Sequence, residues 1–252
     1  MESVSTQLFP IAWIAQSQFV MEYLTSQIGT ECISDPFLIA DFASGENDKI
    51  PNYVHRVLPN ILAPHEGSIG RPVFTYSTDL HGLRLDSLFH LFQEEGILHR
   101  ARAVHARLET MDKEASFRQE QADYILNHGA ERTELDKRLL SAKGIGEKAF
   151  HLGFLNNDVV GYMFEYYKAY TDALASLEVV RKTMRPRGVL LVTQPCSLYP
   201  VDNVEVLSSA GFSFIDGKDI DLKTGAVSSV GENTDLKTLS RRGHYTFFAF
   251  EA

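Results

Sequence analysis

One stretch near the start of the chain constrains the fold more than any other. Residues 37 to 40 are apolar and lead into Asp41, after which small and polar residues continue to Asp48. A short apolar run without polar alternation is typical of a strand buried on both faces, as in parallel sheets. The stretch therefore predicts a parallel strand whose carboxyl end opens through a small-residue loop into a helix.

The same pattern recurs further along, where residues 73 to 78 form a β-prone run that ends at Asp79 and Leu80. In an open parallel sheet, ligands collect outside the carboxyl ends of the strands. Small residues let the backbone approach a ligand closely, and an acid after the second strand can accept hydrogen bonds from ribose hydroxyls. Two strands that each end in an acid predict a site for an adenosine-containing ligand, either a dinucleotide or S-adenosylmethionine.

Helical and strand-like patterns alternate along the rest of the chain. Apolar spacing predicts helices over residues 11–28, 50–61, 83–92, 158–184 and 201–210. Strand-like runs cover residues 149–155, 189–192, 212–215 and 245–250. Alternation indicates an α/β fold with a parallel sheet, and the last two strands, which lack a crossover helix, could pair antiparallel. Residues 98–147 are rich in charge and are interpreted as a helical insertion, although Val104 to Leu108 could form a short third strand.

The composition favours one globular domain and excludes several classes of partner. The 252 residues are 44% hydrophobic and carry a formal net charge of -9, which disfavours nucleic acid and anionic membrane surfaces. The two cysteines, Cys32 and Cys196, make no disulfide framework and favour a reducing cytoplasm. The apolar run from Leu8 to Ala15 is too short to span a bilayer and lacks the basic start of a signal peptide. We expect one cytoplasmic domain over residues 1–252 and leave its oligomeric state open.

The residues after the first strand resemble the first motif of class I S-adenosylmethionine-dependent methyltransferases, an acid followed by glycines at alternate positions. Here Asp41 is followed by Ala43, Gly45 and Asn47 at those positions, so one of the three glycines is kept. The segment from Arg181 to Gly188 is similar to the basic, proline- and glycine-containing turn that precedes a strand in that family. The resemblance implies a Rossmann-like seven-stranded sheet, mostly parallel with a reversed final strand, and S-adenosylmethionine as the cofactor.

A narrower likeness covers residues 37 to 92. Residues 37–47 are similar to the first motif of the SABATH methyltransferases, which methylate small carboxylic acids and ring nitrogens, and residues 79–89 resemble the ribose-binding segment of that family. By this resemblance Asp41 and Ser44 lie near the methionine part of the cofactor, and Asp79 with Leu80 holds the ribose and adenine. The large C-terminal cap of that family has no room in this chain, so the resemblance does not carry over the acceptor. The full set expected to bind the cofactor is Asp41, Ala43, Ser44, Gly45, Asn47, Asp79, Leu80 and Phe154.

Aromatic and N-terminal residues are the candidates for an acceptor pocket. In methyltransferases the N-terminal helix commonly covers the acceptor, so the resemblance implies that residues 1–36 form a helical lid. The expected substrate residues are Trp13, Gln16, Tyr23 and Tyr162, with plain helix packing as the alternative. Either His81 or His151 could face the crevice as a base, although a packed or exposed histidine is the simpler interpretation. We expect no metal site, because His99 and His105 lack helical ligand spacing and no set of cysteines or carboxylates joins them.

Methyl transfer to a small-molecule acceptor by in-line displacement is the function that these patterns favour. Two alternatives stay open. A non-catalytic methyltransferase-like scaffold or interaction domain would explain the lost glycines, and it predicts an occluded cofactor crevice and a sizeable apolar surface patch. A nicotinamide oxidoreductase shares the strand-and-acid pattern, but the single loop glycine and the non-crossover pair of final strands argue against it.

Overall fold

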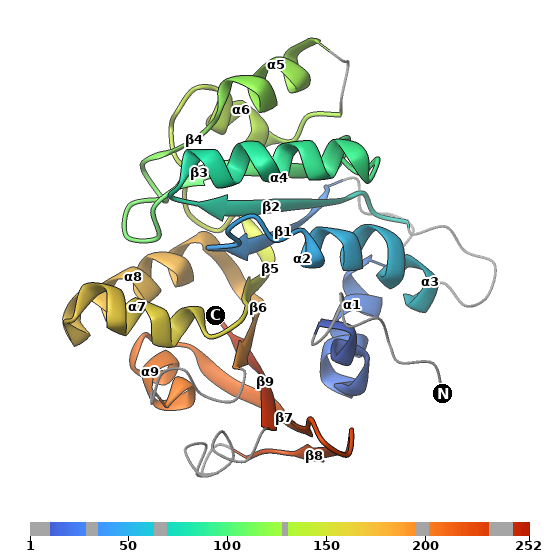
Figure 1. The fold of residues 1–252 in the computed structure, drawn as a ribbon, viewed down its shortest axis with the longest axis vertical. Coiled ribbons are helices and arrows are strands. Elements are labelled where there is room, and N and C mark those ends of the chain that lie inside the picture. The colour runs from blue at the N-terminus through green and yellow to red at the C-terminus, as the bar shows by residue number, and fades with distance from the viewer. Residues whose placement is uncertain (1–10, 29–34, 63–69, 128–130, 195–201, 232–243) are drawn as a thin grey trace.

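The computed structural model describes residues 11–28, 35–62, 70–127, 131–194, 202–231 and 244–252, with the side chains of residues 11–13 left out. These residues form one mixed sheet covered by helices on both faces (Figure 1). The strand order is β4-β3-β2-β1-β5-β6-β9-β7-β8.

Five parallel strands make the half of the sheet that matters most for ligand binding. They are β1 (Phe37–Phe42), β2 (Val73–Asp79), β3 (Ala101–Ala106), β5 (Phe150–Leu155) and β6 (Met184–Gln194). The other four pair antiparallel: β9 (His244–Glu251) lies between β6 and β7 (Ser213–Asp221), while β4 (Ala115–Phe117) and β8 (Val227–Ser229) form the two edges. The chain leaves β1 toward β2 on one side and returns as β5 on the other, so the strand order reverses between β1 and β5.

Helices cover the two faces in separate groups. One face carries the short 3-10 turn η1 (Ile11–Gln16), α1 (Gln18–Ile28), α2 (Lys49–Asn52), the π-helical turn η2 (Tyr53–Val57), α3 (Leu58–Leu62) and α4 (Gly82–Glu94). The other face carries α5 (Gln119–Asn127), α6 (Glu134–Leu140), α7 (Val159–Tyr167), α8 (Tyr170–Thr183) and α9 (Asn203–Ser209). In Figure 1 the α1 to α3 group lies to the right of the sheet and the α7 to α9 group to its left.

The apolar run of β1 explains this arrangement. Phe37 and Ile39 pack with α1 and α3, whereas Leu38, Ala40 and Phe42 pack into the cluster on the opposite face. Successive side chains of a strand point to opposite faces, so a strand that is apolar throughout must be covered on both sides. The prediction of a buried parallel strand at this position is confirmed.

Other predictions need correction. The sheet has nine strands among the described residues rather than seven, and four of its eight strand pairs are antiparallel, so it is not mostly parallel. The reversed closing strand is confirmed, because β9 runs antiparallel to β6. Residues 98–147 contain β3 and β4 as well as α5 and α6, so a helical insertion describes only part of that region.

The described part of the expected N-terminal lid is packed against the sheet. Val20, Leu24 and Ile28 of α1 are buried with residues of β1, β5 and β6. The Ser17 hydroxyl donates a 2.6 Å hydrogen bond to Asp216 of β7, which holds this end of the helix in place. Residues 1–10 and 29–34 of the same segment lie outside the described part of the chain.

Candidate cofactor and acceptor site

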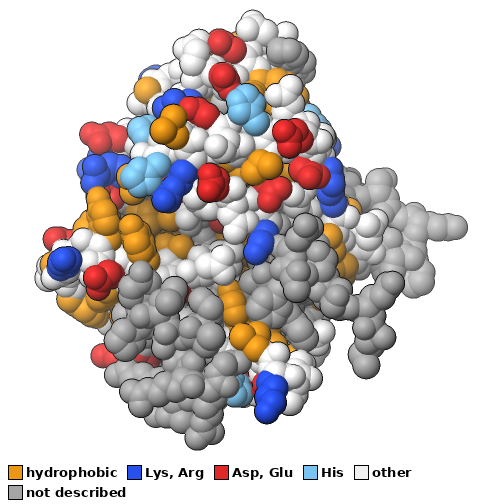
Figure 2. All heavy atoms as spheres, in the orientation of Figure 1, with side chains coloured by type: hydrophobic (Ala, Val, Ile, Leu, Met, Phe, Trp, Pro, Cys, Tyr) orange, Lys and Arg blue, Asp and Glu red, His pale blue; other side chains and the backbone are white. Residues whose placement is uncertain are grey.

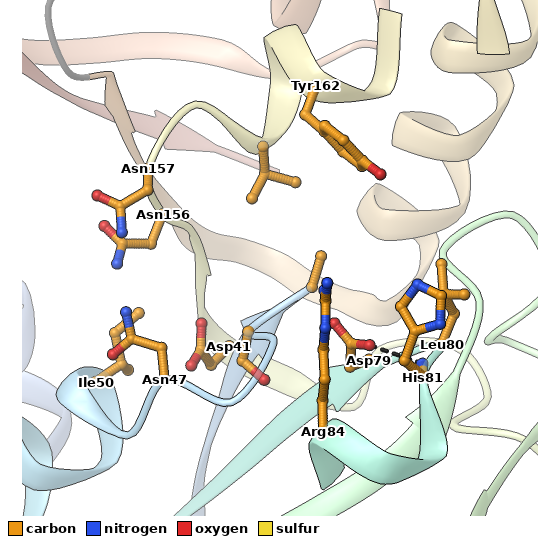
Figure 3. Close-up of a pocket in the computed structure, with 13 residues that line it drawn as sticks. Asp41, Asn47, Ile50, Asp79, Leu80, His81, Arg84, Asn156, Asn157 and Tyr162 are labelled. Atoms are coloured by element: carbon orange, nitrogen blue, oxygen red, sulfur yellow. Dashed lines mark hydrogen bonds between the residues drawn. The ribbon is translucent and has the colours of Figure 1, made fainter. Parts of the chain in front are cut away.

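The carboxyl ends of β1, β2 and β5 meet at a cavity of about 350 Å³, which we call the carboxyl-edge cavity (Figure 3). It lies where the strand order reverses, the position at which open α/β sheets bind ligands. Its size is within the usual range of small-molecule pockets. The described residues that line it are Asp41, Ala43, Ser44, Asn47, Ile50, Asp79, Leu80, His81, Arg84, Asn156, Asn157, Val159 and Tyr162.

Asp41 is the penultimate residue of β1 and is only 2% exposed. Burial raises the pKa of its carboxyl well above 3.8, and the nearby charge of Asp79 raises it further, while a 3.5 Å hydrogen bond from Ser77 acts in the other direction. No ion pair to Asp41 or Asp79 is found in the part of the chain that the structure describes. The cavity therefore holds two carboxyl groups that lack a paired cation.

The loop after β1 folds back on the end of β2. The amides of Ala43 and Ser44 donate to the Thr78 hydroxyl and carbonyl at 3.2 and 2.8 Å, and the Gly45 amide donates to the Asp79 carboxylate at 3.0 Å. Ala43 and Gly45 both adopt positive φ angles, 54° and 65°. The loop thus takes the left-handed turns that glycine favours, although only one of the two residues is glycine.

Asp79 ends β2 and connects two parts of the site. One carboxylate oxygen accepts from Gly45 and the other from the amide of His81 at 2.7 Å, the contact drawn in Figure 3. A carboxylate offers about four lone-pair positions, so each oxygen can accept one more hydrogen bond. The adjacent side chains of His81 and Arg84 come from the start of α4 and line the same cavity.

The opposite wall of the cavity comes from the end of β5 and from α7. Figure 3 shows Asn156, Asn157 and Tyr162 across the cavity from Asp41 and Asp79. Thr193 of β6 fixes the two asparagines, because its hydroxyl donates to the Asn156 side chain at 2.5 Å and accepts from the Asn157 amide at 2.9 Å. Asn157 has a φ of 60°, so these contacts hold a left-handed turn in place.

An apolar recess continues from the cavity between the ends of β2 and β3 and the helix α7. It shares Asp79, Leu80 and Tyr162 with the cavity. Its remaining lining includes Ala106, Leu108, Glu109, Met163, Tyr166 and Tyr167. Figure 2 shows hydrophobic side chains gathered over α7 on this side of the molecule, consistent with the exposed Tyr162 and Tyr166.

The structure brings most of the predicted cofactor residues together. Asp41, Ala43, Ser44, Asn47, Asp79 and Leu80 line the carboxyl-edge cavity, and Gly45 is hydrogen-bonded to Asp79 within the loop. Phe154 does not belong with them: it is 2% exposed and packs with residues of β1 and β6 on the face that α1 covers. Its position near the end of β5 predicted a place at the site, but its side chain points into the core.

The predicted acceptor residues are divided. Tyr162 lines the cavity. Gln16 is exposed on η1 and does not line it, and the side chain of Trp13 lies outside the described part of the chain. Tyr23 lies at the opposite edge of the sheet, where its hydroxyl donates to the carbonyl of His151 at 2.7 Å. Of the two candidate bases, His81 lines the cavity. His151 lies near the amino end of β5, away from the carboxyl-edge cavity, so it cannot act as a base in that cavity.

Some lining residues escaped the sequence analysis, namely Ile50, Arg84, Asn156, Asn157 and Val159. The two asparagines follow β5 as Asp79 ends β2, so the same edge rule applied to that strand would have found them. Arg84 carried no such signal, because a charged residue on the solvent side of an amphipathic helix is ordinary.

Metal-binding clusters and membrane-spanning helices are both absent from the described residues. No group of three or more histidine, cysteine, aspartate or glutamate side chains gathers there in a way that could hold a metal ion. No helix in those residues is long and apolar enough to cross a membrane.

Comparison with known proteins supports the fold. No protein-family profile and no curated protein sequence matches the chain. The structure of the 4+2 cyclase SpnF matches it with a TM-score of 0.51 at 10% identity, over 92% of this chain and 81% of that one. A protein from Galdieria sulphuraria assigned as a sarcosine dimethylglycine methyltransferase also gives 0.51, at 8% identity, over 95% and 84%. The chain has the Rossmann-like fold of the class I methyltransferases, a fold that also includes a cyclase and so does not decide the reaction.

Proposed function

We propose that this protein is an S-adenosylmethionine-dependent methyltransferase that acts on a small-molecule acceptor. The observation that carries the proposal is the pair of buried carboxyl groups, Asp41 and Asp79, in one cavity at the reversal point of the sheet. When bound, S-adenosylmethionine supplies a methyl group on a positively charged sulfur, with a neutral thioether as the leaving group.

The residues at the cavity fit this cofactor. Two carboxyl groups without a paired cation favour a ligand that carries ammonium and sulfonium charges, since opposite charge compensates for their burial. Asp79 keeps lone pairs for the ribose hydroxyls. The apolar recess beside Leu80 and Leu108 has a volume of about 50 Å³, so it offers apolar contact to part of the adenine ring rather than enclosing it.

The same features disfavour a nicotinamide dinucleotide. A pyrophosphate needs free backbone N–H groups and a positive environment. Here the backbone amides of Ala43, Ser44 and Gly45 already donate hydrogen bonds to other residues of the chain, and the loop lies beside the two acids Asp41 and Asp79.

The role of the protein in such a reaction is to align the acceptor and exclude water. Tyr162, Asn156 and Asn157 are the side chains across from the acids and are suited to position an acceptor. A carboxylate acceptor, as in the SABATH resemblance, needs no base, whereas a hydroxyl acceptor could use His81.

The scaffold alternative predicts an occluded crevice and a sizeable apolar surface patch. The exposed rings of Tyr162, Tyr166 and Tyr170 are compatible with the second of these, so the crevice is the feature that separates the two functions. A cavity of about 350 Å³ with polar groups converging on it does not favour that alternative. We therefore keep catalysis as the proposal.

Mass spectrometry of ligand released from freshly purified protein tests the proposal. We expect S-adenosylmethionine or S-adenosylhomocysteine in the released fraction, or, if the site is empty, saturable binding of added S-adenosylhomocysteine. A nicotinamide cofactor in that fraction would support the oxidoreductase instead. If the folded protein binds neither type of ligand, a non-catalytic scaffold is the only one of the three functions that remains.

A further inference from the structure

A second cavity lies at the opposite, amino-terminal edge of the sheet, and the proposed function does not use it. Its volume is about 610 Å³, and we call it the amino-edge cavity. The charged and polar residues that line it include Tyr23, Arg71, His151, Arg185, Arg187 and Glu251. Three guanidinium groups therefore face one cavity in a chain whose formal net charge is -9.

The cationic groups in this cavity are incompletely paired. Arg71 is 3% exposed, and its hydrogen bonds go to the carbonyls of Asp35 and Gln27, at 2.6 and 3.3 Å, rather than to a carboxylate. Within the described residues, neither Arg185 nor Arg187 forms an ion pair. The carboxylates that face the cavity belong to Asp35 and Glu251, so the three arginines exceed the acids by one charge.

One ring in the cavity, that of His151, is approached by two hydrogen-bond donors. The Leu38 amide lies 3.1 Å from Nδ1 of His151, and Arg71 lies 2.8 Å from Nε2 of the same ring. A neutral imidazole can accept at only one of its nitrogens, so in either tautomer one donor faces another donor. The ring stays neutral, because burial first and then Arg185 and Arg71 lower the pKa of His151 to about 3.

The irregular turn at the start of β6, where the pairing with β5 shifts register, carries two of the arginines. Arg187 has a φ of 63°, an unfavourable conformation for a residue other than glycine. Its amide donates to the carbonyl of Ala252, and the Ala252 amide donates to the Gly188 carbonyl at 2.9 Å. A Cβ on Gly188 would lie 2.8 Å from the Arg185 carbonyl, so the turn is closely packed. These backbone contacts fix the main chain that carries Arg185 and Arg187, the two residues that line the cavity from this side.

From this arrangement we propose that the amino-edge cavity binds a small phosphate-bearing anion, either free phosphate or a phosphomonoester. Arg185 and Arg187 supply the charge, and their planar forks match phosphate oxygens. In the tautomer that carries its proton on Nε2, an anion oxygen placed beside Arg71 and His151 accepts the hydrogen bond that one of these donors lacks. The site is separate from the carboxyl-edge cavity and does not depend on the function proposed for it.

Calorimetric titration at low ionic strength tests the site, with inorganic phosphate and glycerol 3-phosphate as the two probes. We expect one binding site per chain for at least one probe, and the tighter probe indicates whether the natural anion is free or esterified. The Arg185→Gln, Arg187→Gln double variant should bind at least about tenfold more weakly. The Arg181→Gln, Lys182→Gln double variant is the control: it removes the same charge from the end of α8, outside the cavity lining, and should change the affinity by less than about twofold.

Two further measurements exclude misfolding of the variant and binding of the anion at the carboxyl-edge cavity as explanations. If the cavity double variant fails to fold by circular dichroism, Arg187→Gln alone replaces it, because that side chain is exposed. Saturating S-adenosylhomocysteine should not compete with the anion, since competition would place the anion at Arg84 in the carboxyl-edge cavity. The proposal is overturned by competition of this kind, by absence of binding for both probes, or by equal loss in the control variant.

Discussion

At the scale of single residues, Asp41 carries a cost that a ligand would relieve. A carboxyl group that is 2% exposed, beside a second acid and without a paired cation, is held more firmly as the neutral acid than in water. Binding sites often retain such groups at the expense of stability. Asp41 is therefore a residue whose replacement should separate stability from ligand binding.

We expect Asp41→Asn to stabilise the ligand-free protein at neutral and alkaline pH. Because the folded-state pKa of Asp41 lies above the unfolded value near 3.8, its stabilising contribution is full below that value and is lost as the pH rises through the folded pKa. Asparagine keeps the shape without the charge. The melting temperature at pH 8 should rise by about 2–4 °C, the effect of about 1 kcal/mol in a domain of this size.

The same comparison repeated toward pH 4 provides the control. There the wild-type carboxyl is protonated as well, so the advantage of Asp41→Asn should disappear. An advantage that stayed constant from pH 4 to pH 8 would show that the charge of Asp41 is not the cause.

The two positions where the loop lacks a glycine should respond in opposite ways. Ala43 has a φ of 54°, so Ala43→Gly relieves left-handed strain and should stabilise the protein by up to about 1 kcal/mol. Asn47 accepts a 2.9 Å hydrogen bond from the Lys49 amide, so Asn47→Gly loses that contact and should destabilise it by about 0.5–1 kcal/mol. Urea unfolding of both variants measures the difference, and equal changes in the two would contradict this account of the loop.

At the scale of elements, strand β5 is the support of the carboxyl-edge cavity. It lies between β1 and β6, and its exit carries Asn156 and Asn157. The space beside Gly153 of β5 is filled by neighbouring side chains. An added Cβ would lie 2.8 Å from the Phe42 ring, 3.0 Å from Met184 and 3.1 Å from Leu190. The absence of a side chain here lets the three strands pack closely.

Gly153→Ala should therefore destabilise the protein by about 1–3 kcal/mol through overpacking. Chemical denaturation measures the loss. Gly45→Ala is a useful comparison, because the space around Gly45 is open and its cost should come from its φ of 65° alone. Unchanged stability in Gly153→Ala would mean that the core can rearrange around an extra methyl group.

Elements with strong local signals were the ones that the sequence predicted well. The runs around Phe37, Val73 and Tyr245 are apolar or β-branched and bounded by turns, so their strands were found with errors of only a few residues. Strand β3 was less clear, because Arg102 and His105 interrupt its apolar pattern. Arg102 is fully buried, and its ion pair with Asp136 at 3.3 Å, together with hydrogen bonds to backbone carbonyls such as that of Leu98, makes a charged residue acceptable inside the sheet.

The residues of the carboxyl-edge cavity were likewise predicted well only where the sequence carries a strong local signal. Acids at strand ends could be predicted because topology alone brings those ends together. The direction of the Phe154 side chain and the place of Tyr23 depended on local register and on the path of α1, which no short motif encodes. The amino-edge cavity could not be predicted, since its arginines come from separate segments, before β2 and at the start of β6.

At the scale of the whole molecule, the sheet has two edges with opposite electrostatic character. The carboxyl edge gathers buried acids, and the amino edge gathers arginines. We therefore expect cationic and anionic ligands to bind at opposite ends of the same strands. The central claim concerns the first of these edges, where Asp79 should hold the ribose of an S-adenosyl ligand.

Calorimetric titration with S-adenosylhomocysteine, comparing wild type with Asp79→Asn, tests that claim most directly. Loss of a charged hydrogen-bond acceptor should weaken binding by about 10- to 100-fold, equivalent to about 1.5–3 kcal/mol. Asp172→Asn, the same change at an exposed position of α8 outside the cavity, should bind like wild type. Folded wild-type protein that gives no heat, or equal affinity in Asp79→Asn, would contradict the assignment of the carboxyl-edge cavity as an S-adenosylmethionine site.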